Sequence, residues 1–188
     1  RYDAGAGRFA GKKSGTSNTD DKNPFILRAY DNCISCYRCV RVCAEREGDY
    51  AINVMNRGFN TQIITEFNND LRDSECTFCG QCVQTCPTGA LGDKKALRDS
   101  ETEGEIKKTR TICPYCGVGC SVDMLSKGDK IVGIQPATDG PANEGALCIK
   151  GQFAFDFIQN ADRLKKPMIR RDDGELHECE WDEALDFA

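Results

Sequence analysis

Residues 33–43 read Cys-Ile-Ser-Cys-Tyr-Arg-Cys-Val-Arg-Val-Cys, and residues 76–87 read Cys-Thr-Phe-Cys-Gly-Gln-Cys-Val-Gln-Thr-Cys-Pro. Both stretches have the spacing C-x2-C-x2-C-x3-C, and an offset of 43 residues maps one onto the other. Three cysteines on a tight loop can wrap one inorganic core, while the fourth points away from it. The repeat predicts two similar halves within residues 24–97, each with a cysteine loop and a short following helix.

This spacing is typical of ferredoxins that hold two [4Fe–4S] clusters, in which the fourth cysteine of each motif binds the other cluster. We therefore expect two clusters with crossed ligand sets. The first set is Cys33, Cys36, Cys39 and Cys86, and the second is Cys76, Cys79, Cys82 and Cys43. Pro87 follows the second motif as in bacterial ferredoxins, whereas Ala44 follows the first, which leaves the ligand count unchanged.

A third group of cysteines has the spacing C-x2-C-x3-C-x27-C. It consists of Cys113, Cys116, Cys120 and Cys148. Gly117 and Gly119 stand between these ligands, where a chain that bends closely around a cluster benefits from positive φ angles. The group predicts a third [4Fe–4S] cluster. Zinc is the alternative. It is a stronger alternative here than at the repeats, where each motif has a third evenly spaced cysteine that a zinc site would not need.

Composition excludes several classes of protein. The chain has 188 residues, 13 cysteines and a formal net charge of −5, to which cluster-bound thiolates would add. We therefore expect no nucleic acid partner. The odd number and close spacing of the cysteines indicate metal ligation rather than disulfides, and free thiols fit a reducing compartment, so the expected location is cytoplasmic. No apolar run approaches the roughly 18 residues of a membrane span.

Shifts in composition divide this α+β chain into five parts. They are a linker or strap at 1–23, a two-cluster ferredoxin-like domain at 24–97, a charged connector at 98–109, a small [4Fe–4S] domain at 110–166 and the start of a further domain at 167–188. The first residue is Arg and the last predicted helix is unfinished. We therefore expect an internal piece of a longer protein, with any upstream targeting signal lost and a larger domain after Ala188.

Short elements are expected between and after the cysteines. Alternating apolar and polar residues predict one β-hairpin from 51–55 and 61–65 around Gly58, and another from 121–125 and 130–135. Towards the C-terminus we expect a helix at 152–160, strands at 168–170 and 175–179, and a helix at 182–188 packed by Trp181, Leu185 and Phe187. His177 is interpreted as a surface or strand residue, and Cys179 as a buried thiol rather than a ligand.

With three cysteine groups in this order, the chain resembles the N-terminal part of the molybdenum- or tungsten-dependent formate dehydrogenase catalytic (alpha) subunit. The resemblance covers residues 24–188. Its most specific pieces are the two repeats, Cys-Pro-Tyr-Cys-Gly-Val-Gly-Cys at 113–120, Leu-Cys-Ile-Lys-Gly at 147–151 and Trp-Asp-Glu-Ala-Leu at 181–185. The last phrase resembles the entry into the family's large pterin-binding domain, so the third cluster domain is expected to open a molybdopterin oxidoreductase domain.

The resemblance implies a function for each part. In this family the third cluster lies beside a molybdenum or tungsten bis-(molybdopterin guanine dinucleotide) cofactor, and a lysine at the position of Lys150 lies between cluster and pterin. Formate is oxidised, or carbon dioxide reduced, at that metal. The catalytic residues belong to the large domain, so this segment alone would not be catalytic. It would relay single electrons to partner subunits that carry flavin or further iron–sulfur clusters.

Three other kinds of protein share some of these motifs. The large iron–sulfur subunit of NADH dehydrogenases can carry a group like that at 113–148, but the two complete repeats and Lys150 argue against it. Iron-only hydrogenases share the two-cluster module, which there leads into a different cysteine set. A non-catalytic electron-transfer subunit would end near Ala188, against which the unfinished helix argues.

Overall fold

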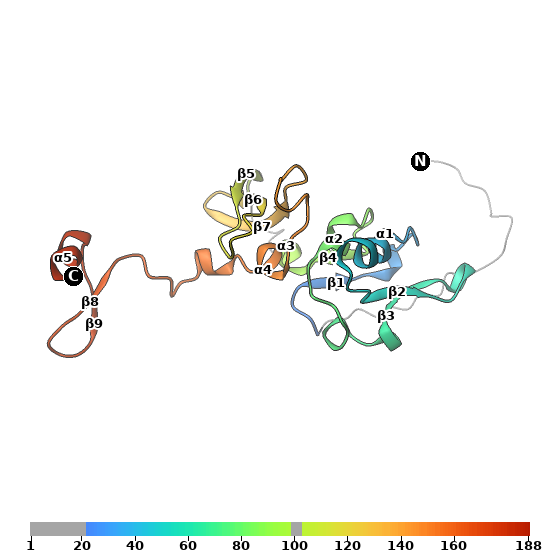
Figure 1. Ribbon diagram of the computed structural model, residues 1–188, viewed down its shortest axis with the longest axis horizontal. Helices are drawn as coiled ribbons and strands as arrows, with labels where there is room; N and C mark the ends of the chain where they lie inside the picture. Colours follow the sequence, from blue (N-terminus) through green and yellow to red (C-terminus); the bar gives the residue numbers. More distant parts are fainter. Residues whose placement is uncertain (1–21, 99–102) are drawn as a thin grey trace. The chain divides into compact units, whose positions relative to one another are not determined.

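The computed structural model describes residues 22–98 and 103–188 (Figure 1). The chain forms two compact units, which divide between Phe155 and Asp156. Short helices and small sheets make up both units, as the predicted α+β class requires. Almost all of the predicted linker at 1–23, and residues 99–102 of the predicted connector, lie outside the described residues.

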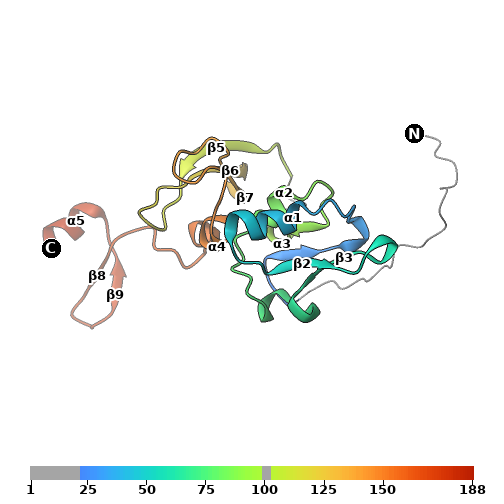
Figure 2. The same cartoon turned by 45° about the vertical axis from the view of Figure 1, so that its right-hand side comes forward.

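The ferredoxin-like part of the first unit consists of two small antiparallel sheets with short helices. Its strands and helices are β1 (Ile26–Arg28), α1 (Arg38–Arg41), β2 (Ile52–Met55), β3 (Gln62–Thr65), α2 (Gln81–Thr85), β4 (Leu91–Asp93) and α3 (Lys94–Arg98). Between them lie the short turns η1 (Tyr30–Asn32), η3 (Gly58–Asn60), η4 (Glu66–Asn68) and η5 (Leu71–Asp73), and the π-helical η2 (Val42–Glu47). Strand β1 pairs with β4. Strand β2 pairs with β3 (Figure 2).

The predicted hairpin around Gly58 is confirmed. Ile52 pairs with Thr65 and Met55 pairs with Gln62, and Gly58 opens the turn with a φ of 60°. The hairpin contributes to a core of six buried side chains, which are Ile26, Ile52, Ile63, Leu71, Leu91 and Phe153. Most cysteines of the two repeats pack against this core. The interior is therefore small and partly made of thiols.

The second predicted hairpin is also confirmed, but it belongs to a three-stranded sheet. The strands are β5 (Lys107–Ile112), β6 (Ser121–Lys127) and β7 (Lys130–Pro136), in the order β5-β6-β7. Residues 107–109 of β5 fell within the predicted connector. This strand is almost wholly exposed and lacks an apolar period. Ion pairs fix it instead, since Lys108 and Arg110 lie 2.8 Å and 2.6 Å from the buried carboxylate of Asp123 on β6.

The predicted helix at 152–160 is wrong. The structure has α4 (Ile149–Phe153), a break at Ala154 and a separate 3-10 turn, η7 (Asp156–Gln159). Phe153 and Phe155 are both buried but belong to two different cores. Ala154, between the two rings, has the non-helical angles φ −96° and ψ 45°, so the helix ends at Phe153.

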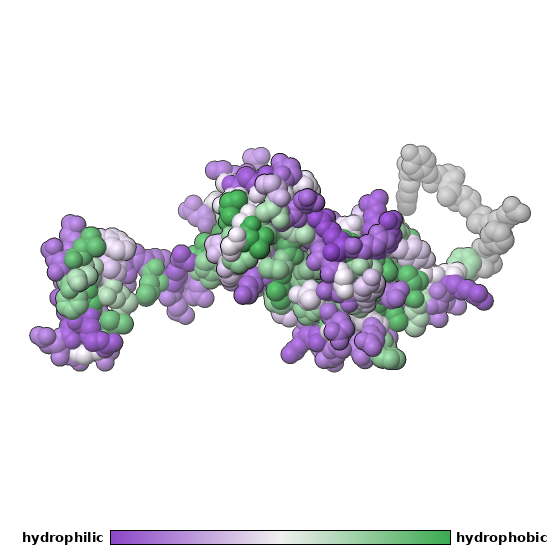
Figure 3. All heavy atoms as spheres, viewed as in Figure 1, coloured by the Kyte–Doolittle hydropathy of each residue, from purple (hydrophilic) through white to green (hydrophobic). Residues whose placement is uncertain are grey.

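The second unit is a small hairpin followed by a helix. Its elements β8 (Met168–Arg170), β9 (Leu176–Glu178) and α5 (Trp181–Phe187) confirm the predicted strands and helix. Trp181, Leu185 and Phe187 do not pack this helix as predicted, because each side chain is about two-thirds exposed within the unit. Figure 3 shows hydrophobic residues at the surface of this unit. Across the described ranges, no helix combines the length and apolarity needed to cross a bilayer.

Candidate metal centres

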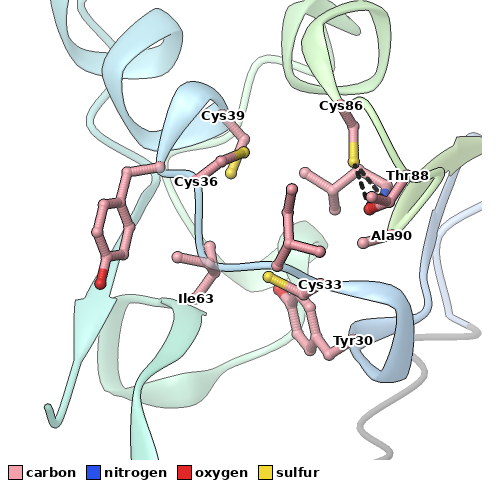
Figure 4. A pocket seen from close by; sticks show the side chains of 11 residues that line it. Tyr30, Cys33, Cys36, Cys39, Ile63, Cys86, Thr88 and Ala90 are labelled. Carbon is pink, nitrogen blue, oxygen red and sulfur yellow. Dashed lines mark hydrogen bonds between the residues drawn. The ribbon is translucent and has the colours of Figure 1, made fainter. Parts of the chain in front are cut away.

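The first cavity gathers cysteines from both halves of the repeat. Cys33, Cys36, Cys39 and Cys86 all line it, together with Tyr30, Ile63, Thr88 and Ala90 (Figure 4). About 360 Å³ of space in and around this cavity, open solvent included, is free of protein atoms. Cys33 and Cys36 come from the loop before α1, Cys39 lies within α1, and Cys86 caps the end of α2. The structure thus brings together the first predicted ligand set.

A second cavity has the reciprocal arrangement. It is lined by Cys76, Cys79 and Cys82 from the second half and by Cys43 from the first, and about 330 Å³ in and around it, open solvent included, is free of protein atoms. Cys43 lies in η2, directly after α1. Each short helix therefore carries the fourth cysteine of its motif away from its own loop to the other cavity. The structure brings together the second predicted ligand set as well.

The two cysteine loops share an unusual backbone. Ser35 and Tyr37 have φ angles of 54° and 60°, and Phe78 and Gly80, at the same positions of the repeat, have 55° and 78°. Left-handed residues turn the chain sharply within a few residues. In both loops the first of them donates its N–H to the first thiol, from Ser35 to Cys33 and from Phe78 to Cys76, at 3.4 Å each. The shared spacing therefore produces a shared geometry.

Burial makes four of these thiols weaker acids. It raises the pKa of Cys39 and Cys76 to about 11 and that of Cys79 to about 12, and it also raises the pKa of Cys82 well above its usual value. Cys86 differs, because although burial works in the same direction, hydrogen bonds from Leu91 and other donors lower the pKa of this thiol. Metal binding requires thiolates, so a cation must displace protons from the buried cysteines.

The third group lies beside the three-stranded sheet. After burial, the charges of Cys113, Cys116 and Cys148 are the main factors that raise the pKa of Cys120, so all four thiols lie within electrostatic reach. Cys113 donates its N–H to the carbonyl of Cys120 at 2.8 Å, and this bond closes the loop. Cys116 and Cys148 are exposed. The predicted set is therefore close together, with two members facing outward.

Helix α4 follows Cys148 directly and packs against the second cysteine loop. Gln152 is buried, donates to the carbonyl of Ile134 at 2.9 Å and accepts from Gln84 of α2 at 3.3 Å. Gly80 lies so close that a Cβ there would stand 2.8 Å from Cγ of Gln152. Buried Gln81 donates to the carbonyl of Gly145. The third group is thus joined to the second cavity.

Three further residues were singled out in the sequence, and the structure describes the position of each. Lys150 is exposed on α4. His177 is exposed on β9 and lies 2.8 Å from Asp173, which confirms its interpretation as a surface residue of a strand. Cys179 is buried, as predicted, with its thiol 3.6 Å from the carbonyl of Pro167.

Sequence reasoning missed Asp49. It also missed the three glutamines Gln81, Gln84 and Gln152, which hold α4 and the loop before it against the second cysteine loop, an interaction that we call the α4 contact. Asp49 lines the second cavity, and its carboxylate accepts two hydrogen bonds from Thr77. A single acidic residue after η2 carries no local signal of that position. Gln81, Gln84 and Gln152 are ordinary polar residues in the sequence, and their partners lie far along the chain. Only the glycine of Cys-Gly-Gln-Cys could have indicated a close contact, and no prediction was based on it.

Three family models match consecutive parts of the chain. The ferredoxin-like domain of NADH-quinone oxidoreductase subunit 3 matches residues 23–92, the Fe4S4 domain of molybdopterin oxidoreductases matches 106–160, and the molybdopterin oxidoreductase model matches 163–188. The order is that of a ferredoxin-like domain and an Fe4S4 domain that precede a molybdopterin domain.

Curated relatives point the same way. A protein of Staphylococcus haemolyticus whose name assigns it to the formate dehydrogenases is 36% identical over 88% of the chain, and one of Staphylococcus aureus is 35% identical over 88%. An NADH-quinone oxidoreductase subunit of Rhizobium meliloti is 36% identical over 99%. The chain spans only 20% or 21% of the length of these relatives. It is an iron–sulfur segment of the molybdopterin oxidoreductase type, and its predicted resemblance to the N-terminal region of formate dehydrogenase subunits is confirmed.

Proposed function

We propose that this chain is the electron-transfer segment of a formate dehydrogenase and holds three [4Fe–4S] clusters. The observation that carries the proposal is the crossed arrangement of the cysteines. Each of two cavities is lined by three cysteines from one half of the repeat and one from the other. Bound clusters of this kind accept and release single electrons. The residues of the chain would position them.

The shape of the cavities favours clusters over zinc. A single zinc ion needs ligands that converge on one point, whereas a cubane keeps its four ligands apart at its corners. Within residues 22–98 and 103–188, no three His, Cys, Asp or Glu side chains converge as a single ion requires. Four thiols nevertheless line each cavity. This combination supports a four-iron group in each.

The α4 contact supports a defined order of the three sites. Gln152 and Gly80 join the third group to the second cavity, not to the first. The first cavity instead lies near the surface, with Cys36 exposed and Ile34 62% exposed beside it. We therefore place the first site nearest to the electron-accepting partner, which we expect to be an iron–sulfur or flavin subunit.

Lys150 is proposed to face the pterin cofactor. It follows Cys148 by two residues and is exposed at the start of α4. An ammonium group there could donate hydrogen bonds to an edge of a molybdenum or tungsten bis-(molybdopterin guanine dinucleotide) held by the remainder of the protein. Formate oxidation or carbon dioxide reduction would take place at that metal. We propose the cytoplasm as the location, since the many thiols require reducing conditions.

A second candidate is a subunit of an NADH-quinone oxidoreductase. Two findings favour it: the match to that enzyme's ferredoxin-like domain at 23–92, and the Rhizobium relative that aligns with 99% of the chain. Such a subunit would need no catalytic pterin. Measurement of pterin and of molybdenum or tungsten in the purified full-length protein distinguishes between the two functions.

The test of the proposed function uses the anaerobically purified full-length subunit. Added formate should bleach the visible absorbance of the iron–sulfur clusters. The variant Cys116→Ser should lose this bleaching while iron content and spectra of the two ferredoxin-like clusters persist. A wild-type protein with all clusters and pterin present that does not respond to formate would refute the formate assignment. Bleaching retained in Cys116→Ser would refute the place of the third cluster in the route.

A further inference from the structure

The two repeat cavities differ in the charge of the residues around them. Asp49 lines the cavity of Cys43, Cys76, Cys79 and Cys82, and its charge acts on the thiols of Cys76 and Cys79. Of the described residues that line the other cavity, none is a carboxylate. An electron that enters the second cavity therefore meets a nearby negative charge that is missing from the lining of the first.

Two further charged side chains lie in this region. Glu47 lies beside the Cys79 thiol and acts in the same direction as Asp49. Arg28 is buried and acts on Cys76 with the opposite sign. Its guanidinium also lies 5.8 Å from the ring of Tyr30, which lines the first cavity. Arg28 is therefore close to both cavities, whereas the carboxylates are specific to the second.

Hydrogen bonds to sulfur add to this difference. In the first cavity, Cys33 accepts from Ser35, and Cys86 accepts from Leu91 at 3.5 Å and contacts the hydroxyl of Thr88 at 3.9 Å. In the second cavity, Cys76 accepts from Phe78 and Cys79 accepts from the N–H of Gln81, whereas Cys86 of the first cavity has several donors. Donors to the sulfurs raise the reduction potential of an iron–sulfur cluster, and nearby negative charge lowers it. Both effects therefore lower the reduction potential of a cluster in the second cavity relative to that of a cluster in the first.

We propose that Asp49 holds the reduction potential of the cluster in the second cavity below that of the cluster in the first. This inference rests on the proposed function, because it requires a [4Fe–4S] cluster in each cavity. One electron that leaves the second cluster then reduces the first by one electron in a favourable step. The charge difference would direct electrons away from the α4 contact and towards the exposed first cysteine loop.

Asp49 also has a structural role, and the experiment must separate it from the charge. The Oδ2 atom accepts from the N–H and from the hydroxyl of Thr77, at 3.2 Å and 2.5 Å. Asp49→Asn keeps the shape and one acceptor but removes the charge. Asp49→Glu keeps the charge, and Thr77→Val removes the hydroxyl donor while the carboxylate stays.

Redox titrations of the anaerobic full-length protein, followed by electron paramagnetic resonance, give the potentials. Asp49→Asn should raise the lower of the two ferredoxin-type potentials. At a fixed ambient potential the ratio of reduced to oxidised cluster should rise about tenfold, which is about 59 mV for a one-electron couple. Asp49→Glu and Thr77→Val should leave that potential near the wild-type value.

Thr88→Val identifies which of the two potentials belongs to the cluster in the first cavity, because it removes a polar contact of Cys86. It should lower the higher potential. The inference is overturned if Asp49→Asn, with both clusters assembled, moves neither potential or lowers one. It is also overturned if Thr88→Val shifts the lower of the two potentials. This second test does not depend on any Asp49 variant. A wild-type protein that lacks two ferredoxin-type signals would instead refute the proposed function.

Discussion

The two cysteine loops have the same spacing and the same left-handed backbone, but different surroundings. In the first loop Ile34 and Tyr37 are 62% and 39% exposed. In the second loop Gly80 and Gln81 are buried beneath α4. The ligand geometry thus follows from the repeat, whereas the surroundings depend on residues far along the chain. One loop is suited to meet a partner protein, and the other is fixed inside the molecule.

The largest expected effect comes from the side chain that covers the second loop. Phe153 is wholly buried and stacks on Phe25 with ring centroids 5.0 Å apart. Truncation of such a ring lowers the free energy of unfolding by about 4 kcal/mol. We expect this loss for Phe153→Ala in anaerobic urea titrations. Phe67→Ala is the control, because Phe67 is 86% exposed. Equal losses in the two variants would contradict the difference between covered and open regions.

Two glycines with the same backbone angle test the close contact itself. Gly80 and Gly48 have φ angles of 78° and 77°, but a Cβ at Gly80 would meet Gln152 and Phe153, whereas nothing lies within 4 Å at Gly48. Alanine at Gly48 should cost about 1 kcal/mol of unfolding free energy from backbone strain. At Gly80 the collision should raise the loss to about 3 kcal/mol. Thermal unfolding of both variants gives the comparison, and similar losses would disprove the contact.

The loop before Cys148 is held from both halves of the repeat, and the two contacts should differ in strength. Gln81 donates to the carbonyl of Gly145 from a buried position, while exposed Arg46 donates to the carbonyls of Asn143 and Glu144. A substitution of Gln81 that removes this buried donor should lower the unfolding free energy by about 1–2 kcal/mol. For Arg46→Ala we expect less than about 0.5 kcal/mol. The reverse order in denaturant titrations would show that the first half dominates this contact.

The smallest effect concerns thiol reactivity after cluster removal. Hydrogen bonds lower the pKa of Cys86, whereas burial raises that of Cys79 to about 12. A thiol with a lower pKa becomes a reactive thiolate at a lower pH. As pH rises from 6 to 9, iodoacetamide should therefore label Cys86 first, and Cys79 should stay largely unlabelled. Peptide mass spectrometry measures the order, with circular dichroism as the control for retained structure. Simultaneous labelling would contradict the assigned environments.

Much of this arrangement could be predicted from the sequence, because its causes are local. The repeat predicted which thiols share a cavity, and turn residues such as Gly58 and Gly174 marked the hairpins. The role of these thiols as cluster ligands, and of Lys150 at a pterin, stays a prediction. Strand β5 was missed because ion pairs to Asp123 fix it in place of an apolar face. The helix predicted at 152–160 was wrong, because the local pattern of apolar residues marks neither the start of α4 at Ile149 nor its break at Ala154.

The exchange of Cys43 and Cys86 between the two cavities has a consequence for the origin of this part of the chain. A single half would supply three thiols to its own site and carry a fourth that points elsewhere. Two copies of such a half, related by a twofold axis, would complete both sites by mutual donation. The repeat therefore has the arrangement that fusion of such a homodimer into one polypeptide would produce. Such a fusion would leave the two copies free to differ, with one loop exposed and the other covered by a neighbouring helix.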